Sequence, residues 1–206
     1  NDKGELLIEG LTPTEQDVFE LSDEFVKSSL SSTGVNLFEM DSYSKRLWLE
    51  PALSILAIDA PPVAESVNLL IPKAKAKVSL RLPPTEDPDH AMNMLEQHIK
   101  ENTPFNANVE FIPEAKGKGI LVDPKNEFSS KLIESFNKHW ENEVAYMGVG
   151  GSIPFANVFI NEFPNSEIVL VGAGDEEGNA HAPNESVNIS DIQKLIDSLT
   201  DAISNY

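Results

Sequence analysis

The sequence contains no cysteine among its 206 residues. Disulfide bonds and thiolate metal sites are therefore excluded, and the composition favours a cytoplasmic protein. The sequence also has no apolar run of about 18 residues, so no membrane-spanning helix is predicted. The residues after Asn1 show no charged segment followed by an apolar one, which is the pattern of a secretion signal.

Basic residues are scarce. Lysine and arginine together number 15 against 34 aspartates and glutamates, which gives a formal net charge of -19. Such a chain is repelled by phosphate backbones and anionic lipid surfaces, so we expect neither nucleic acid nor a membrane as partner. The carboxylates permit metal binding without indicating it. The hydrophobic fraction of 40% suffices for a core, and the length fits one large domain or two small ones.

The first predicted element is a helix that begins after Thr12 and ends near Ser31. Thr12 suits the cap position, Pro13 the first helical position and Glu15 the capping box. Apolar residues follow at helical spacing, so one face of this helix is expected to pack. They are Val18, Leu21, Phe25 and Val26.

The next elements predict an α+β domain. Strands are expected at 53–58 and 71–82, a helix after Asp87 and Pro88, and a short strand at 109–112. This order is most of a ferredoxin-like split β-α-β fold that lacks its first strand and helix. In the second strand the apolar residues alternate with a polar set, so one face packs and the other meets water or a partner. The polar set is Lys73, Lys75, Lys77, Ser79 and Arg81.

A change to Lys- and Gly-rich composition at 113–119 predicts a domain boundary, which divides the chain into residues 1–115 and 116–206. The second part alternates helices with an apolar run, which predicts a partial α/β layer. Its expected elements are a helix at 128–140, a helix from Phe155, a buried strand at 168–171 and a last helix capped by Ser190.

Two loops in the second part are candidate sites, because loops at the ends of elements often carry function. One is the turn Gly150–Gly151–Ser152, and the other carries His181. An imidazole there can ligate a metal, although a surface or capping role is the commoner one for a lone loop histidine. Ser152 has the alternative role of a helix cap. The acidic loop between the two sites is either a solvated loop or, less often, a calcium loop; its residues are Asp175, Glu176 and Glu177.

Three stretches, taken in order and with their spacing, resemble the carnosinase and aminoacylase type of zinc metallopeptidase, and most of all its dipeptidase branch. They are Leu47-Trp48-Leu49-Glu50-Pro51-Ala52-Leu53-Ser54-Ile55, then the strand from Ile71 to Pro83 with Asp87-Pro88, then Gly-Gly-Ser-Ile-Pro at 150–154 with Ala-His-Ala-Pro-Asn-Glu at 180–185. The resemblance covers nearly the whole chain. It implies that residues 1–115 are the later part of a lid domain that forms a homodimer, and that residues 116–206 are the last segment of a catalytic α/β domain.

The resemblance also assigns roles to individual residues. His181 matches a ligand of one of two zinc ions, with manganese or cobalt as alternative metals. Arg81 matches the lid arginine that holds the substrate carboxylate, and a guanidinium fork suits a carboxylate. Gly150, Gly151 and Ser152 match the turn that contacts the substrate, where glycines let backbone N–H groups approach a ligand. Without the resemblance, Arg81 would simply continue the solvated lysine face. Glu185 is expected to orient His181 or to cap the following helix.

The sequence departs from the family in what it lacks. The His-x-Asp ligand pair, the bridging aspartate and the glutamates that supply the general base are absent, and Gly148-Val149 stands where many dipeptidases have Arg-Glu. We therefore expect no catalytic residue in this chain, at most one weak metal site, and no activity of the chain alone. As part of an intact enzyme it would serve a metal-dependent amidohydrolase that cleaves dipeptides or N-acyl amino acids. The alternative is a non-catalytic dimerisation or binding module derived from the lid.

Overall fold

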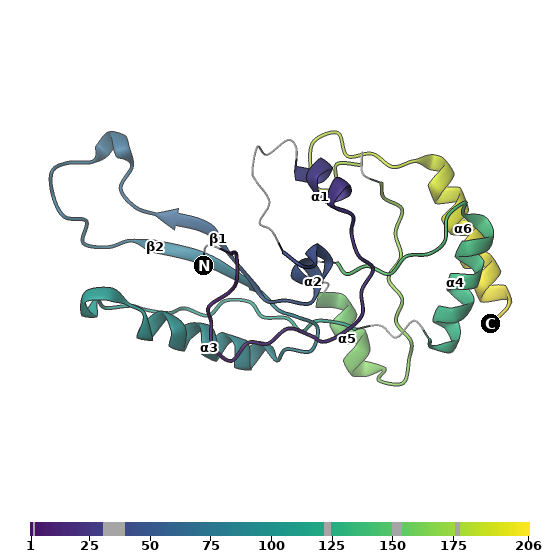
Figure 1. Cartoon of the computed structure of the whole chain (residues 1–206), viewed down its shortest axis with the longest axis horizontal. Helices are drawn as coiled ribbons and strands as arrows, with labels where there is room; N and C mark the ends of the chain where they lie inside the picture. The colour runs from purple at the N-terminus through teal and green to yellow at the C-terminus, as the bar shows by residue number, and fades with distance from the viewer. Residues whose placement is uncertain (2, 31–39, 122–124, 150–153, 176–177) are drawn as a thin grey trace. The chain divides into compact units, whose positions relative to one another are not determined.

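The computed structural model describes residues 1, 3–30, 40–121, 125–149, 154–175 and 178–206 (Figure 1). The chain divides into two compact units. Unit 1 is Asn1–Ile120 with Met147–Ser152, and unit 2 is Leu121–Tyr146 with Ile153–Tyr206. The predicted Gly150–Gly151–Ser152 turn lies outside the described residues, as do Glu176 and Glu177.

Unit 1 contains an antiparallel hairpin of β1 (Ala52–Asp59) and β2 (Lys75–Arg81). Leu53 lies opposite Leu80 and Ile55 opposite Val78, which gathers apolar side chains on one face. The exposure along β2 does not alternate as the sequence predicted, because residues 75–77 are all exposed, residues 78–80 are half-buried and Arg81 is exposed. Both strands are confirmed, although the second is shorter than expected. A bulge after Ile55 interrupts the register.

Helix α3 (Pro88–Glu101) follows the hairpin and runs along it (Figure 1). The carboxylate of Asp87 accepts hydrogen bonds of 2.9 Å from the backbone N–H groups of Asp89 and His90, and Pro88 occupies the first turn. This is the cap that the sequence predicted. Ala91 and Leu95 are buried, so the expected apolar stripe packs.

The predicted helix from Thr12 is wrong in its start. The helix observed there, α1, spans Asp23–Leu30, and residues 11–22 are not helical. The backbone N–H of Thr14 instead donates to the carbonyl of Leu49 over 2.8 Å, and the Thr14 side chain is buried. A tertiary hydrogen bond has therefore replaced the local capping box. Leu49 follows the short helix α2 (Tyr43–Trp48).

Two predicted strands are also not formed. Residues 109–112 and 168–171 have no strand assignment, and β1 and β2 are the only strands in the described part of the chain. A strand exists only through hydrogen bonds to a neighbour, and no described segment pairs with either run. The 3-10 turns Val63–Glu65 and Pro104–Asn106 complete unit 1.

Unit 2 is built from α4 (Glu127–His139), α5 (Pro154–Glu162) and α6 (Ile189–Ser204). All three helices were predicted, but the side chain that caps α6 is Asn188 rather than Ser190. Helix α4 packs against α6 (Figure 1). The hydroxyl of Ser135 donates to the carbonyl of Ser198 over 2.7 Å in this buried contact.

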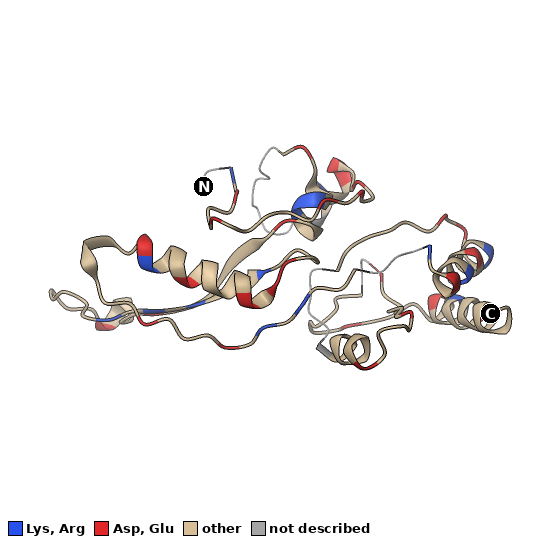
Figure 2. Ribbon diagram, turned by 90° about the horizontal axis from the view of Figure 1, so that it is seen from below, with Lys and Arg blue, Asp and Glu red and all other residues tan. Residues whose placement is uncertain are grey.

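The architecture is thus a set of helices with one small antiparallel sheet, which confirms the α+β class. Acidic positions are spread over helices and loops of both units, with fewer basic positions among them (Figure 2). In the described ranges, no helix is long and apolar enough to cross a membrane.

Candidate functional site

Arg81 is the last residue of β2 and is exposed. The sequence has only one other arginine, Arg46, which forms an ion pair of 2.9 Å with Glu50 and donates to the carbonyl of Gly4. The side chain of Arg81 has no hydrogen bond or ion pair with any residue that the structure describes. Its guanidinium is therefore available for a carboxylate, which it can bind with two parallel hydrogen bonds.

The lysines on the same face of β2 differ from Arg81. Lys77 forms an ion pair of 2.6 Å with Glu114, and Lys75 lies opposite Asp59 in the hairpin register. The charges of these two lysines can be neutralised by acidic residues of unit 1 itself. The solvated-face interpretation therefore describes the lysines better than it describes Arg81, whose register partner is Ala52.

The turn that follows Arg81 is hydrogen-bonded to the N-terminal segment. Pro83 is fully buried, and the N–H of Glu86 donates to its carbonyl over 3.1 Å. The hydroxyls of Thr14 and Thr85 share a hydrogen bond of 2.7 Å, and the N–H of Thr85 donates to the Thr14 hydroxyl over 3.3 Å. Thr14 is thus bonded both to this turn and to Leu49, and the base of Arg81 has a defined position in unit 1.

The same turn is also contacted by Gly119. A Cβ atom at this position would lie 2.6 Å from Cα of Pro84, a distance that real side chains do not reach. Only glycine lets the two backbones approach so closely. Sequence reasoning missed both Thr14 and Gly119, because the first appeared as part of a capping box and the second as part of a linker.

His181 lies in unit 2, on a loop closed by a hydrogen bond of 2.9 Å from the N–H of Ser186 to the carbonyl of Gly178. Inside this loop the N–H of Ala182 donates to the carbonyl of Asn179. The backbone of His181 has φ 65°, in the left-handed region, which is unfavourable for a residue with a Cβ. Its imidazole is exposed. Strained backbone of this kind is concentrated at ligand-binding sites.

Glu185 takes neither of the roles expected for it. Asn188 caps α6, and no hydrogen bond joins the carboxylate of Glu185 to His181 among the described residues. The backbone N–H of Glu185 donates to the carbonyl of Ala182 and so helps to close the loop. The loop is therefore held by its backbone.

The described residues do not make a complete metal centre. They contain no group of three or more histidine, aspartate or glutamate side chains placed to hold an ion. Structural and catalytic zinc sites use three or four protein ligands, so His181 alone does not fit a resident zinc ion. Of the acidic loop, only Asp175 is described, and the calcium alternative remains a prediction.

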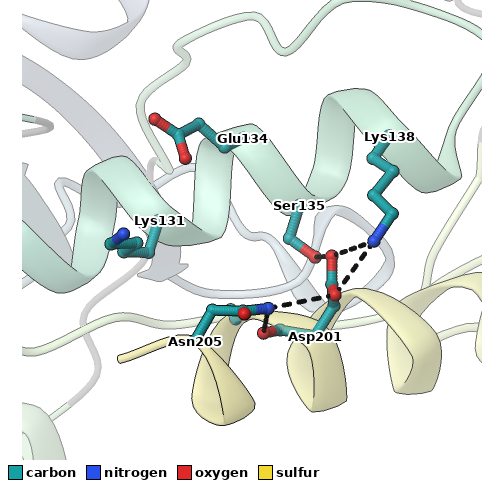
Figure 3. A pocket seen from close by; sticks show the side chains of 7 residues that line it. Lys131, Glu134, Ser135, Lys138, Asp201 and Asn205 are labelled. Carbon is teal, nitrogen blue, oxygen red and sulfur yellow. Dashed lines mark hydrogen bonds and ion pairs between the residues drawn. The ribbon is translucent and has the colours of Figure 1, made fainter.

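A hollow between α4 and α6 contains the best-defined charged cluster of unit 2 (Figure 3). Asp201 accepts hydrogen bonds of 3.0 and 2.8 Å from Lys138 and one of 3.3 Å from Ser135. The hydrogen bond from Lys138 is the largest cause that holds the pKa of Asp201 below its usual value. This carboxylate of α6 is already satisfied by donors from α4, so the cluster ties α4 to α6 and is not a candidate active site.

Comparison with known proteins relates this chain to peptidases. Residues 12–107 match the M20 peptidase dimerisation domain. A cysteinylglycine-S-conjugate dipeptidase from Corynebacterium striatum is 26% identical over 205 residues, which cover 95% of this chain and 44% of that protein. The chain thus spans about half the length of its relatives.

Solved structures show the same fold. Human carnosine dipeptidase 1 aligns with all of this chain at a TM-score of 0.75 and 19% identity, over 47% of its own length. An M20 family metallo-carboxypeptidase from Sulfolobus solfataricus aligns with 98% of the chain at a TM-score of 0.71 and 22% identity, over 48% of its own length. The hairpin with Arg81 lies within residues 12–107, which match the peptidase dimerisation domain, and the chain as a whole is a homologue of a cysteinylglycine-S-conjugate dipeptidase.

Proposed function

We propose that this chain is the lid and C-terminal part of a metal-dependent dipeptidase, in which Arg81 holds the carboxylate end of the substrate. The observation that carries the proposal is the Arg81 guanidinium at the end of β2, which has no partner among the described residues and lies inside the region that matches the dimerisation domain. The substrate would be a dipeptide or an N-acyl amino acid, both of which end in a free carboxylate. Gly150, Gly151 and Ser152 are proposed to contact the same end of the substrate.

The surface of the chain supports its place in a larger assembly. The accessible surface is 15974 Å². Two separate compact units of these sizes would expose roughly 11,000 Å² in total. Large apolar side chains are exposed, among them Leu70 at 97% and Val63 at 92%. Surface of this kind is usually covered by further protein. We infer that additional catalytic-domain sequence or a second subunit covers it.

The proposed metal chemistry belongs to the intact enzyme. Two zinc ions are expected there, with His181 as ligand of one of them. Because the described residues lack the remaining ligands, this chain alone is expected to bind zinc weakly and to hydrolyse nothing. The proposed location of the enzyme is the cytoplasm.

Homodimerisation through the lid is the second part of the proposal. The hairpin has one hydrogen-bonded neighbour per strand, so each strand presents an outer edge that is unpaired within the described residues. Free edges invite pairing with another chain. Light scattering of the purified protein at high concentration is expected to give the mass of two chains, and a monomer mass would contradict this.

A non-catalytic dimerisation or binding module is the rival proposal. It is favoured by the absence of a metal cluster from the residues described above. The two proposals differ in the expected effect of substitutions at Arg81 and His181. In an enzyme these substitutions should lower the activity, whereas in a module that only pairs chains they should have no effect on pairing.

The test uses the natural full-length protein supplied with zinc, and dipeptides with either a free or an amidated C-terminus. Arg81→Ala should raise KM for the free-carboxylate substrate roughly 10- to 100-fold, because a hydrogen bond to a charged group contributes about 1.5–3 kcal/mol. The amidated substrate should respond little. Lys75→Ala, on the same face of β2, is the matched control. An absence of hydrolysis by the unmodified protein, or an equal response of the two substrates to Arg81→Ala, would reject the proposal.

A further inference from the structure

The turn between β2 and α3 is a short and stiff connection. It contains two consecutive prolines, Pro83 and Pro84, which begin two residues after Arg81. Proline fixes its own φ and restricts the residue before it, so this turn has few backbone rotations with which to absorb a displacement. A shift at Pro84 is therefore passed to the end of β2, where Arg81 lies.

Two segments that are remote in sequence contact this turn. Thr14, 71 residues before Thr85, is bonded to it through the shared hydrogen bond of 2.7 Å. Gly119, 35 residues after Pro84, touches its backbone. Thr14 is buried and is itself bonded to Leu49. We call this set of residues, Thr14 with Pro83–Thr85 and Gly119, the clamp.

The segment before Gly119 is also tied to unit 1, by charges. Glu114 pairs with Lys77 of β2, and Lys116 pairs with Asp89 of α3. All four of these side chains are more than half exposed, and exposed ion pairs typically contribute 0–1 kcal/mol. They guide the segment along the domain, whereas the backbone contact at Gly119 sets its closest approach.

We propose that Thr14 and Gly119 are positioning residues for Arg81. They hold the turn at two adjacent residues, Pro84 and Thr85, so the guanidinium is presented at one place when a substrate carboxylate arrives. The inference rests on the proposed role of Arg81 as carboxylate anchor and adds the residues that fix it. Neither residue touches the substrate. Both act through Pro83–Thr85.

The central experiment changes Gly119 to alanine in the full-length enzyme. Gly117→Ala is the matched control, because a Cβ atom at Gly117 meets nothing within 4 Å. Gly119→Ala should raise KM for the free-carboxylate dipeptide roughly tenfold, since small misplacements of a binding group are costly. We expect kcat, and KM for the amidated dipeptide, to change less than about twofold. Gly117→Ala should leave all of these values unchanged.

A second pair of variants tests the inference independently, in case Gly119→Ala fails to fold. Thr14→Val removes the hydroxyl that bonds to Thr85 and keeps the side-chain shape, whereas Thr14→Ser keeps the hydroxyl. Thr14→Val should show the same rise in KM, selective for the free carboxylate, and Thr14→Ser should restore it. The exposed Thr12, changed to valine, is the control.

The outcomes separate this inference from the proposed function. If Arg81→Ala discriminates the two substrates but both Gly119→Ala and Thr14→Val behave like their controls, the clamp has no positioning role. Equal losses on both substrates would show a merely structural role and overturn the inference in the same way. If Arg81→Ala itself fails to discriminate, the proposed function of Arg81 fails, and the inference fails with it.

Discussion

Arg81 and His181 are the two described residues with a proposed role at the substrate or the metal, and their surroundings differ. Arg81 stands at the end of a strand, and the turn that follows it contacts two remote residues. Thr85 is hydrogen-bonded to Thr14, 71 positions upstream, and Pro84 is touched by Gly119, 35 positions downstream. His181 stands on a loop closed by its own backbone, in a left-handed conformation. One position is determined by the tertiary structure of its unit, and the other by local hydrogen bonds and strain.

This contrast indicates how each residue responds to its neighbours. A side chain placed by long-range contacts can be displaced by changes far away in the sequence, as proposed for Gly119. A side chain placed by a local loop should respond mainly to changes within the loop itself. The predictions below test the two kinds of placement.

The largest effect is expected from His181→Ala in the full-length enzyme supplied with zinc. Loss of the imidazole should lower kcat/KM at least about 100-fold, because changes even in the residues that support metal ligands cost 10- to 100-fold. Bound zinc, measured by elemental analysis, should fall together with the activity. The matched control is Asn184→Ala, which changes a residue of the same loop that also has a positive φ but no imidazole. Full zinc content with unchanged activity in His181→Ala would show that His181 is not a ligand.

The sequence predicted the parts of the fold whose signals are local. The strand composition of β2, the Asp87–Pro88 cap and the apolar stripes of α4 and α6 all lie within a few residues of the elements that they specify. Such signals survive folding because they agree with the tertiary structure.

The failures of prediction have one cause, which is a partner distant in sequence. The capping box at Thr12–Glu15 is a valid local signal, but Thr14 gains more from Leu49 and Thr85 than from a helix start. The apolar runs at 109–112 and 168–171 have strand composition, yet no described neighbour pairs with them. Gly119 gives no local signal at all, because the reason for its glycine is Pro84. The role of His181 came from the resemblance to a family, since a lone loop histidine does not identify a metal ligand by its chemistry.

A medium effect is expected on stability when His181 is replaced by glycine or by alanine. Both variants lack the imidazole, but only alanine retains the Cβ that makes φ 65° unfavourable. His181→Gly should therefore be more stable than His181→Ala by about 1 kcal/mol. Urea unfolding of the 206-residue chain, followed by Trp140 fluorescence in a Trp48→Phe background, measures this difference in unit 2.

The control for this pair is Ala180→Gly in the same loop. Ala180 does not have a positive φ, so glycine there only adds freedom to the unfolded chain and should be slightly destabilising. If His181→Gly proves no more stable than His181→Ala, the loop does not hold His181 in the left-handed region, and the argument from local strain is wrong.

The smallest effect is expected from acid, which should distinguish the clamp in unit 1 from the α4–α6 contact in unit 2. The clamp around Arg81 consists of hydroxyls and backbone, and none of its residues titrates. The α4–α6 contact instead depends on Asp201, whose pKa is lowered mainly by the hydrogen bond from Lys138. A carboxyl with a lowered pKa in the folded state stabilises the fold above its ordinary pKa of about 4. That contribution is lost as the pH falls through the folded-state pKa.

Asp201→Asn should therefore flatten the pH dependence of unit 2 stability below about pH 4 and slightly lower the stability at pH 7. Unfolding curves between pH 7 and pH 3, read from Trp140 for unit 2 and from Trp48 for unit 1, measure both effects. The Trp48 signal reports a helix, α2, that directly precedes the Leu49 carbonyl bonded to Thr14. This signal should be the same with and without Asp201→Asn. An unchanged acid response of unit 2 in the variant would mean that Lys138 and Ser135 do not hold Asp201 in solution, and that α4 and α6 are joined by their buried contacts alone.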